Sequence, residues 1–86
     1  MKIKDGFILR VVAKQNVVLP AEGDLELSKM MVVNSTGKFL WEQLEQEITK
    51  EELIRRVLTR YDIDEKTAST CVEQFTERLE KHGFLV

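Results

Sequence analysis

Residues 33–41 read VNSTGKFLW, and this segment decides the fold because a strand ends and a helix begins within it. Val33 closes a β-branched run, which favours an extended strand. Asn34 or Ser35 can accept hydrogen bonds from the free N–H groups of the first helical turn. Trp41, the only tryptophan, follows on the helix and is expected to be a buried anchor. The segment contains no catalytic chemistry, so the search for function turns toward binding.

The chain on the amino-terminal side of this segment predicts an antiparallel meander. Its three expected strands span residues 6–13, 17–19 and 25–33. The first is β-branched and aromatic around a single charge, Arg10, which suits a strand covered on much of both faces. Residues 14–16 are expected to form a tight turn. The second strand ends at Pro20, which has no N–H to donate to a ladder, and the third begins with alternating Leu25 and Leu27.

The remainder of the chain predicts three amphipathic helices, because its apolar residues recur at helical spacing. Their apolar faces carry Gly37, Leu40, Trp41, Leu44 and Ile48; then Leu53, Ile54, Val57, Leu58 and Tyr61; then Ala68, Cys71, Val72, Phe75, Leu79 and His82. Thr49 and Glu52 form a capping box at the second helix, and Asp64 caps the third. Gly83 is the expected left-handed stop. Residues 84–86 are apolar and should fold back onto the core.

Three strands followed by three helices, the last two joined by a tight turn, predict an α+β fold. The outline is that of a winged helix-turn-helix-like domain, with a three-stranded antiparallel sheet before the three helices. A chain of 86 residues that is 43% hydrophobic can build one small core. No linker, repeat or low-complexity tract interrupts it. We therefore expect residues 1–86 to form a single domain.

Composition and charge limit the partners and the compartment. A formal net charge of −2 gives no general attraction to nucleic acid or to anionic membranes. No stretch approaches the roughly 18–20 apolar residues of a membrane span, and the first residues do not form a secretory signal. A single cysteine fits a reducing compartment. The sequence thus predicts a cytoplasmic protein without a membrane partner.

Catalytic and metal-binding groups are too sparse to form a site. The only cysteine and the only histidine, Cys71 and His82, are separated by about 16 Å along the third helix, which excludes a nucleophile–base pair. Cys71 is expected to be an inert core residue, and His82 suits the helix end. Glu22, Asp24 and Glu26 lack the spacing of a calcium loop and indicate a solvated acidic loop. We expect no enzyme activity, no metal and no cofactor.

DNA binding is the first alternative, because the outline resembles a helix-turn-helix. Residues 64–81, the helix that would enter the groove of DNA, hold five acidic and three basic side chains. This balance has the wrong sign for a surface lined by phosphates. We therefore predict no nucleic-acid partner, and a small winged-helix DNA-binding regulator remains only as an alternative.

The edge of the third strand offers a different mode of binding. Residues 30–33 read MMVV and sit at the end of the meander, where backbone N–H and C=O groups lack a partner strand. An extended peptide can add there as a further strand, whichever side chains face the core. The same edge could pair with its own copy, so a homodimeric interaction scaffold is the second alternative.

The ordered set of motifs resembles the pyrroloquinoline quinone biosynthesis protein D (PqqD-like) family. The matching segments are residues 6–13, 33–37 with Leu40, Trp41 and Leu44, then 49–53, 61–63, Phe75, Leu79 and 83–85. Together they span nearly the whole chain. Val33 stands where the family usually has leucine, a change that the volume of the site tolerates.

The resemblance implies a winged helix-turn-helix-like domain that acts as a peptide chaperone, or RiPP recognition element, rather than an enzyme. Such domains hold the leader segment of a ribosomally made precursor peptide and present it to a modifying enzyme, often a radical SAM protein. The pathway need not be quinone biosynthesis. The resemblance places the peptide beside the third strand, in the groove made with the third helix. The residues implied are Lys29, Met30, Met31, Val32 and Val33 on the strand, and Ser69, Val72, Glu73 and Thr76 on the helix.

Overall fold

The computed structural model describes residues 1–21 and 30–86, and it has the expected α+β architecture. Its elements are β1 (Phe7–Val12), β2 (Gln15–Pro20), β3 (Met31–Val33), α1 (Ser35–Leu44), α2 (Lys50–Arg60) and α3 (Glu65–Lys81). The strands form one antiparallel sheet in the order β1-β2-β3. The predicted fold class is confirmed. The predicted start of the third strand, at Leu25 and Leu27, lies outside the described residues.

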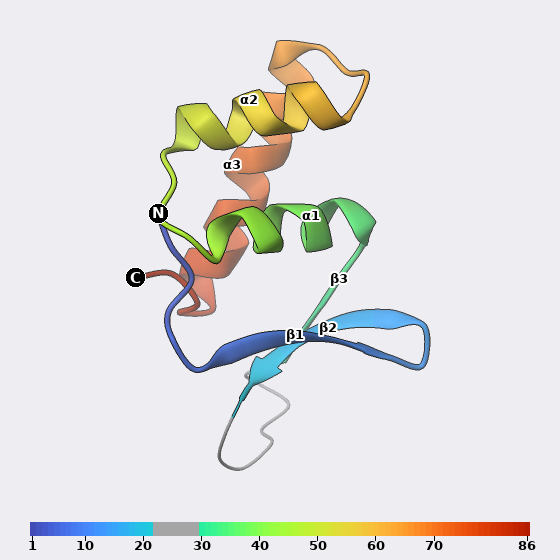
Figure 1. Cartoon of the computed structure of the whole chain (residues 1–86), viewed down its shortest axis with the longest axis vertical. Helices are drawn as coiled ribbons and strands as arrows, with labels where there is room; N and C mark the ends of the chain where they lie inside the picture. The colour runs from blue at the N-terminus through green and yellow to red at the C-terminus, as the bar shows by residue number, and fades with distance from the viewer. Residues whose placement is uncertain (22–29) are drawn as a thin grey trace.

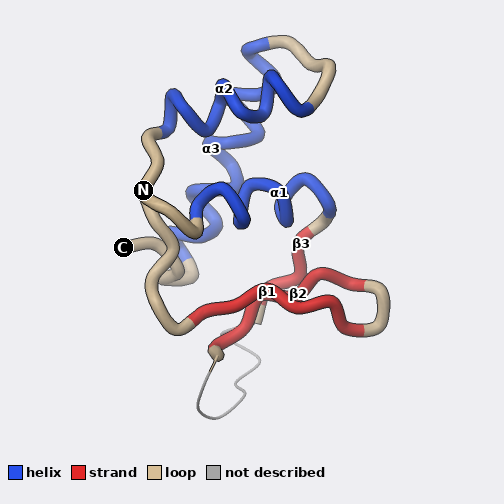
Figure 2. The backbone as a smooth tube through the Cα atoms, viewed as in Figure 1, coloured by secondary structure: helices blue, strands red, loops and turns tan. Residues whose placement is uncertain are grey.

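The elements stack as a sheet beneath a group of three helices (Figure 1). α1 lies between the sheet and α2, and α3 passes behind both (Figures 1 and 2). The two ends of the chain lie together, because Ile3 forms a β-bridge with Leu85 and the N–H of Val86 donates to the carbonyl of Lys2. This pairing anchors the chain ends against the helices.

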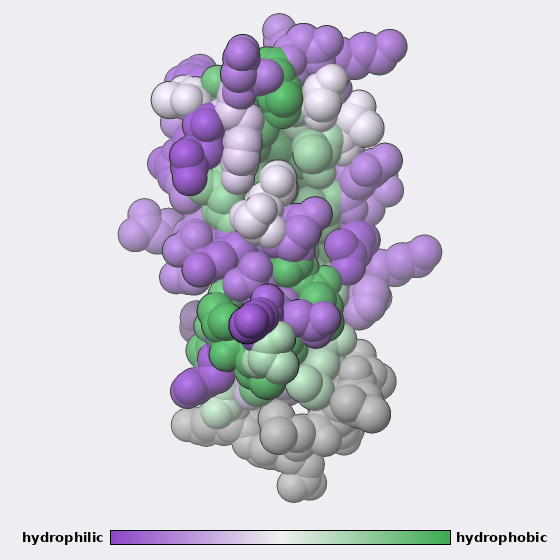
Figure 3. Space-filling view, turned by 90° about the vertical axis from the view of Figure 1, so that its right-hand side faces the viewer, coloured by the Kyte–Doolittle hydropathy of each residue, from purple (hydrophilic) through white to green (hydrophobic). Residues whose placement is uncertain are grey.

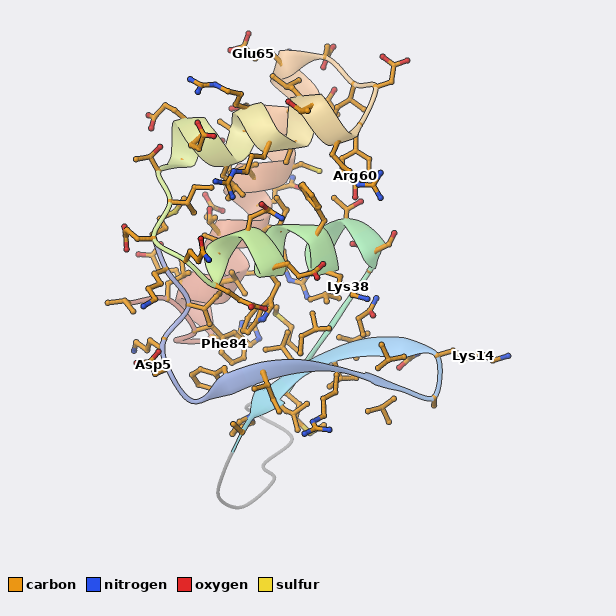
Figure 4. The ribbon with its side chains drawn as sticks, in the orientation of Figure 1. Asp5, Lys14, Lys38, Arg60, Glu65 and Phe84 are labelled. Atoms are coloured by element: carbon orange, nitrogen blue, oxygen red, sulfur yellow. The ribbon has the colours of Figure 1, made fainter. Side chains whose placement is uncertain are left out.

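The core lies between the sheet and the helices and centres on two aromatic side chains. Trp41 and Phe84 are almost completely buried, and the ring of Phe84 meets Trp41 edge-on at 5.9 Å and Phe7 at 4.6 Å. Figure 4 shows Phe84 between β1 and α1. The predicted anchor at Trp41 is confirmed, and so is the fold-back of Phe84 and Leu85, whereas the Val86 side chain is exposed. Ile48 is buried as expected, but from the loop that follows α1 rather than from the helix itself.

Local hydrogen bonds start and stop the helices. The capping side chains accept from backbone N–H groups as follows: Asn34 from Gly37 at 2.8 Å, Thr49 from Glu52 at 3.2 Å, and Asp64 from Thr67 at 2.7 Å. Gly83 has φ +76°, the predicted left-handed stop. The capping box is only half formed, because the Glu52 carboxylate pairs with Arg55 and Arg56 instead of returning to the cap.

The β1–β2 turn differs from the predicted one at residues 14–16. Val12 pairs with Gln15, so the turn consists of Ala13 and Lys14 alone. Both residues have positive φ, 51° and 66°, as a tight hairpin turn of this length requires. Such turns usually carry asparagine or glycine, so neither residue indicated the turn. Lys14 projects from the hairpin tip, away from the helices (Figure 4).

Candidate functional site

Among the described residues, β3 forms an edge of the sheet with no strand beyond it. β3 pairs with β2 through Met31 opposite Val18 and Val33 opposite Asn16. Backbone groups of successive strand residues point to opposite sides. The N–H of Ala21 donates to the carbonyl of Gly6, so Val17 and Leu19 direct their backbone groups toward β1. Asn16 and Val18 therefore face β3, and their partners Val33 and Met31 point toward β2. The N–H and C=O of Val32 therefore face outward from the sheet. The Val32 side chain is 53% exposed, whereas those of Met31 and Val33 are buried.

A helix lies opposite this edge. The Arg78 guanidinium of α3 reaches across the gap, with its Nη2 atom 3.5 Å from the carbonyl oxygen of Val32. Between the two elements lies a hollow of about 210 Å³. Its lining comes from the end of β3, the start of α1 and α3: Val33, Asn34, Thr36, Gly37, Leu40, Cys71, Gln74, Phe75 and Arg78. We call this region the β3–α3 groove.

Gly37 allows the three elements to meet so closely. A Cβ atom at this position would lie 2.9 Å from Cβ of Val33 and 3.2 Å from Cε1 of Phe75. Both distances are shorter than ordinary carbon contacts, so only glycine fits without a shift of the neighbours. The floor of the groove is thus a close contact between β3, α1 and α3, made of the buried side chains of Val33, Leu40 and Phe75.

The groove continues along α3. A larger hollow of about 620 Å³ shares Gln74 and Arg78 with the first; among the described residues its lining also includes Glu77, Glu80 and Lys81. The apolar floor beside β3 therefore gives way to a charged surface of mixed sign. Figure 3, which shows the face at the right of Figure 1, has apolar atoms gathered at the level of the sheet and mainly hydrophilic atoms over the helices.

The strand residues that the sequence implicated have different positions. Met31 and Val33 belong to the core, Met30 is half-buried, and Val32 faces outward. Lys29 lies outside the described residues. Of these residues, only Val32, through its backbone carbonyl, and Val33, on the floor, border the β3–α3 groove.

The helix residues that the sequence implicated do not line the β3–α3 groove. Val72 and Thr76 are buried, and the Thr76 hydroxyl donates to the carbonyl of Val72 at 2.9 Å. The Glu73 carboxylate forms an ion pair with Lys50 at the start of α2, at 2.8 Å. Ser69 is half-buried and lines a separate shallow hollow of α3.

The residues that do line the groove occupy the opposite flank of the buried stripe. At 100° per residue, Cys71, Gln74 and Arg78 lie about 100–180° around α3 from Ser69 and Glu73. The apolar stripe alone leaves both flanks equivalent. The complementary charges of Lys50 and Glu73 were the one available signal that the Glu73 flank faces α2.

Cys71 also departs from its predicted place, because it is half-buried and lines the groove instead of lying in the core. His82 is exposed; its ring stacks on Phe84 at 6.0 Å, and Nδ1 lies 2.9 Å from the carbonyl oxygen of Arg78. The structural role predicted for His82 at the helix end fits this contact.

Searches of the described residues find neither a metal-binding cluster nor a long apolar helix. Among residues 1–21 and 30–86, no three His, Cys, Asp or Glu side chains are placed to hold a metal ion. No helix in this part of the chain has the length and hydropathy needed to cross a membrane. The pKa of Asp64 lies below its ordinary value because the carboxylate accepts hydrogen bonds from Thr67.

Comparisons with known proteins agree on the fold. The sequence model of the family described as coenzyme PQQ synthesis protein D (PqqD) matches residues 15–85. The solved structure of TbiB1 in complex with the TbiA(beta) leader peptide superimposes with a TM-score of 0.76 at 22% sequence identity. The match covers 99% of this chain and 94% of that chain. A search of curated proteins found no match.

Proposed function

The chain belongs to the coenzyme PQQ synthesis protein D (PqqD) family, and from this premise we propose that it captures the leader segment of a ribosomally made precursor peptide and presents it to a modifying enzyme. The observation that carries the proposal is the free backbone edge of Val32 beside α3. An extended segment adds there as a fourth strand, with main-chain hydrogen bonds for affinity and side-chain hollows for specificity.

The hollow beside β3 suits one side chain of an extended peptide, whose next residues reach the larger hollow of about 620 Å³ along α3. Its own volume of about 210 Å³ is below the roughly 300–1,000 Å³ that is usual for a whole small-molecule site. A hollow of this size takes a single aliphatic or aromatic side chain, placed over the floor made by Val33, Leu40 and Phe75. The rest of the peptide lies along the open groove.

The structural comparison supports the same role. TbiB1 was solved with a leader peptide bound, and it shares this fold over almost the whole of both chains. We propose Val32, Val33, Cys71, Gln74 and Phe75 as peptide contacts, together with Arg78, in place of the flank that carries Ser69, Val72, Glu73 and Thr76. Met30 would extend the contact upstream of Val32, and we retain Lys29, which lies outside the described residues, as a proposed contact from sequence.

The remaining parts of the proposal concern partners and location. We propose that the chain binds without a catalytic step of its own and that residues 1–86 act as one unit. The modifying enzyme, such as a radical SAM protein, would be the second partner, and the cytoplasm the place of action. The mixed charge of the groove offers little attraction to a phosphate backbone, which speaks against nucleic acid as the partner.

A titration followed by NMR tests this proposal. The ¹⁵N-labelled chain is titrated with a synthetic peptide whose sequence is encoded by the short open reading frame nearest its gene. We expect the amide signals of Val32, Val33, Cys71 and Gln74 to shift, while those of β1 stay in place. Shifts confined to β1, or no shift with any neighbouring small peptide, would contradict the proposal.

A control separates peptide binding from self-association. Sedimentation of the free chain at several concentrations should give a monomer if the β3 edge is reserved for a peptide. A dimer that dissociates when the peptide is added would also place the peptide at that edge. A dimer that persists in the presence of the peptide, with no shift of the Val32 amide, supports the homodimeric scaffold instead.

A further inference from the structure

Arg78 occupies the edge at which the peptide is proposed to add. Its guanidinium lies 3.5 Å from the Val32 carbonyl oxygen, and its side chain lines both hollows of the groove. In the free chain it therefore covers the one backbone carbonyl that β3 directs outward. A charged side chain on a free strand edge also hinders pairing with a second copy.

The other arginines of the helices have partners outside the groove, and Arg56 also donates to Gln43 of α1 at 2.8 Å. Arg55 and Arg56 contact the carboxylate of Glu52 at 2.8 and 3.6 Å, and the Arg60 guanidinium lies over the ring of Tyr61 at 5.7 Å. Among the described residues, Arg78 has no carboxylate within ion-pair distance. Its contact with Val32 joins a full charge to a neutral acceptor at the outer limit of a hydrogen bond.

Strand addition changes the surroundings of this guanidinium. The N–H of an added strand takes the Val32 carbonyl as its acceptor, so the guanidinium loses its acceptor there. The bound peptide also excludes water from the groove, and a charge that loses water without a partner is costly. A carboxylate on the peptide removes this cost, because arginine binds carboxylates through paired, charge-assisted hydrogen bonds.

The geometry points to Arg78 as a specificity-determining residue: we propose that the groove selects an extended segment with an aspartate or glutamate beside its apolar anchor residue. Side chains of the added strand alternate between its two faces. Because Arg78 lies where the two hollows meet, the carboxylate belongs to the next residue on the same face as the anchor. This inference rests on the proposed function and adds the chemical class of the recognised segment.

A selection from random sequences tests the inference without knowledge of the natural peptide. A displayed library of random linear peptides is panned against the full chain and against Arg78→Gln, Arg78→Glu and Arg60→Gln. Arg60→Gln is the matched control, because it removes the same charge from α2 at a site outside the groove. All four proteins are first compared by thermal melting and circular dichroism, and equal folding is expected because both arginines are exposed.

The expected consensus differs between the four selections. The unaltered chain and Arg60→Gln should enrich an aliphatic or aromatic residue followed at fixed spacing by Asp or Glu. Peptides selected on Arg78→Gln should keep the apolar residue and lose the preference for an acidic residue. Peptides selected on Arg78→Glu should carry Lys or Arg in place of the acidic residue. For a peptide from the first pool, changing its Glu to Gln should weaken binding to the unaltered chain about tenfold, but to Arg78→Gln only slightly.

The outcomes distinguish this inference from the proposed function. An apolar consensus without an acidic residue, or an acidic residue retained by Arg78→Gln, overturns the role of Arg78 while peptide binding stands. If no pool gains a consensus, or if the selected peptides fail to shift the Val32 amide, the proposed function fails as well.

Discussion

The two free edges of the sheet differ in what lies beside them. β1 offers six residues and β3 only three. At β1, the backbone groups of Ile8 and Arg10 point toward β2. Because the direction alternates along a strand, those of Leu9 and Val11 face outward. The hollow beside the first half of β1, about 310 Å³, is lined by residues 3–9 and Glu45, and Val11 beyond it is 63% exposed.

The β3 edge instead faces α3, with the groove between them. Main-chain hydrogen bonds alone would bind an extended chain of almost any sequence at either edge. Side chains of the bound segment that enter a hollow distinguish one sequence from another. At β3, such a hollow is lined by Cys71, Gln74 and Arg78 of α3. The comparison indicates that the adjacent helix, rather than the length of the edge, makes a strand edge into a site.

The largest expected effect comes from a substitution in the floor of the β3–α3 groove. Gly37→Ala places a Cβ against Val33 and Phe75 and should lower the free energy of unfolding by about 1–3 kcal/mol, the usual cost of overpacking. Chemical denaturation measures this value. Peptide affinity should fall too, because the floor must shift. An unchanged stability would mean that the elements around the groove adjust freely.

A matched pair of proline substitutions compares the two edges directly. Val32 and Val11 are both exposed valines whose N–H faces away from β2. Val32→Pro should weaken peptide binding tenfold or more, about 1.4 kcal/mol, because the added strand loses a hydrogen bond, whereas Val11→Pro should leave affinity unchanged.

Calorimetric titration gives the affinities for this pair, and circular dichroism confirms that both variants fold. The assignment of the peptide to the β3 edge would be wrong if Val11→Pro were the variant that lost affinity.

A second matched pair tests which flank of α3 the peptide contacts. Cys71→Tyr fills the groove and should reduce affinity several-fold, whereas Ser69→Tyr adds the same ring on the flank away from β3 and should have little effect. Fluorescence anisotropy with a labelled peptide measures both. The reverse order would restore the helix face that the sequence first implicated.

The smallest expected effect concerns the start of α3, which holds this helix in place beside β3. The pKa of Asp64 lies below its ordinary value of 3.8 because the carboxylate accepts hydrogen bonds from Thr67. A lowered folded-state pKa means that the ionised form stabilises the fold at pH above 3.8 and that this contribution is lost as the pH falls through the lowered value.

Thermal melts across this acidic range should therefore show a steeper loss of stability for the unaltered chain than for Asp64→Asn, which keeps the cap without the titration. Identical pH profiles would show that the cap does not depend on ionisation.

Sequence predicted the features that depend on neighbouring residues. The caps at Asn34, Thr49 and Asp64 and the stop at Gly83 each involve groups within one helical turn, and the structure confirms them. The buried anchor at Trp41 followed from helical spacing. These local rules were enough to obtain the order of strands and helices.

The missed features depend on packing between distant elements. Which flank of α3 faces β3 is set by how α3 packs on α1 and α2, so spacing along the helix could not separate Cys71 and Arg78 from Ser69 and Glu73. The turn at Ala13 and Lys14 was missed for another reason, since strand register imposes positive φ on residues that do not favour it.

Amide hydrogen exchange of Val32 is the most direct test of a strand added at β3. In the free chain this N–H faces outward without a strand partner, and in the peptide complex it should donate to a peptide carbonyl. We predict that peptide binding slows exchange at Val32 by at least about tenfold, while Leu9 and Val11 on the β1 edge exchange at the same rate as before. Protection at Leu9 and Val11 with none at Val32 would contradict the account.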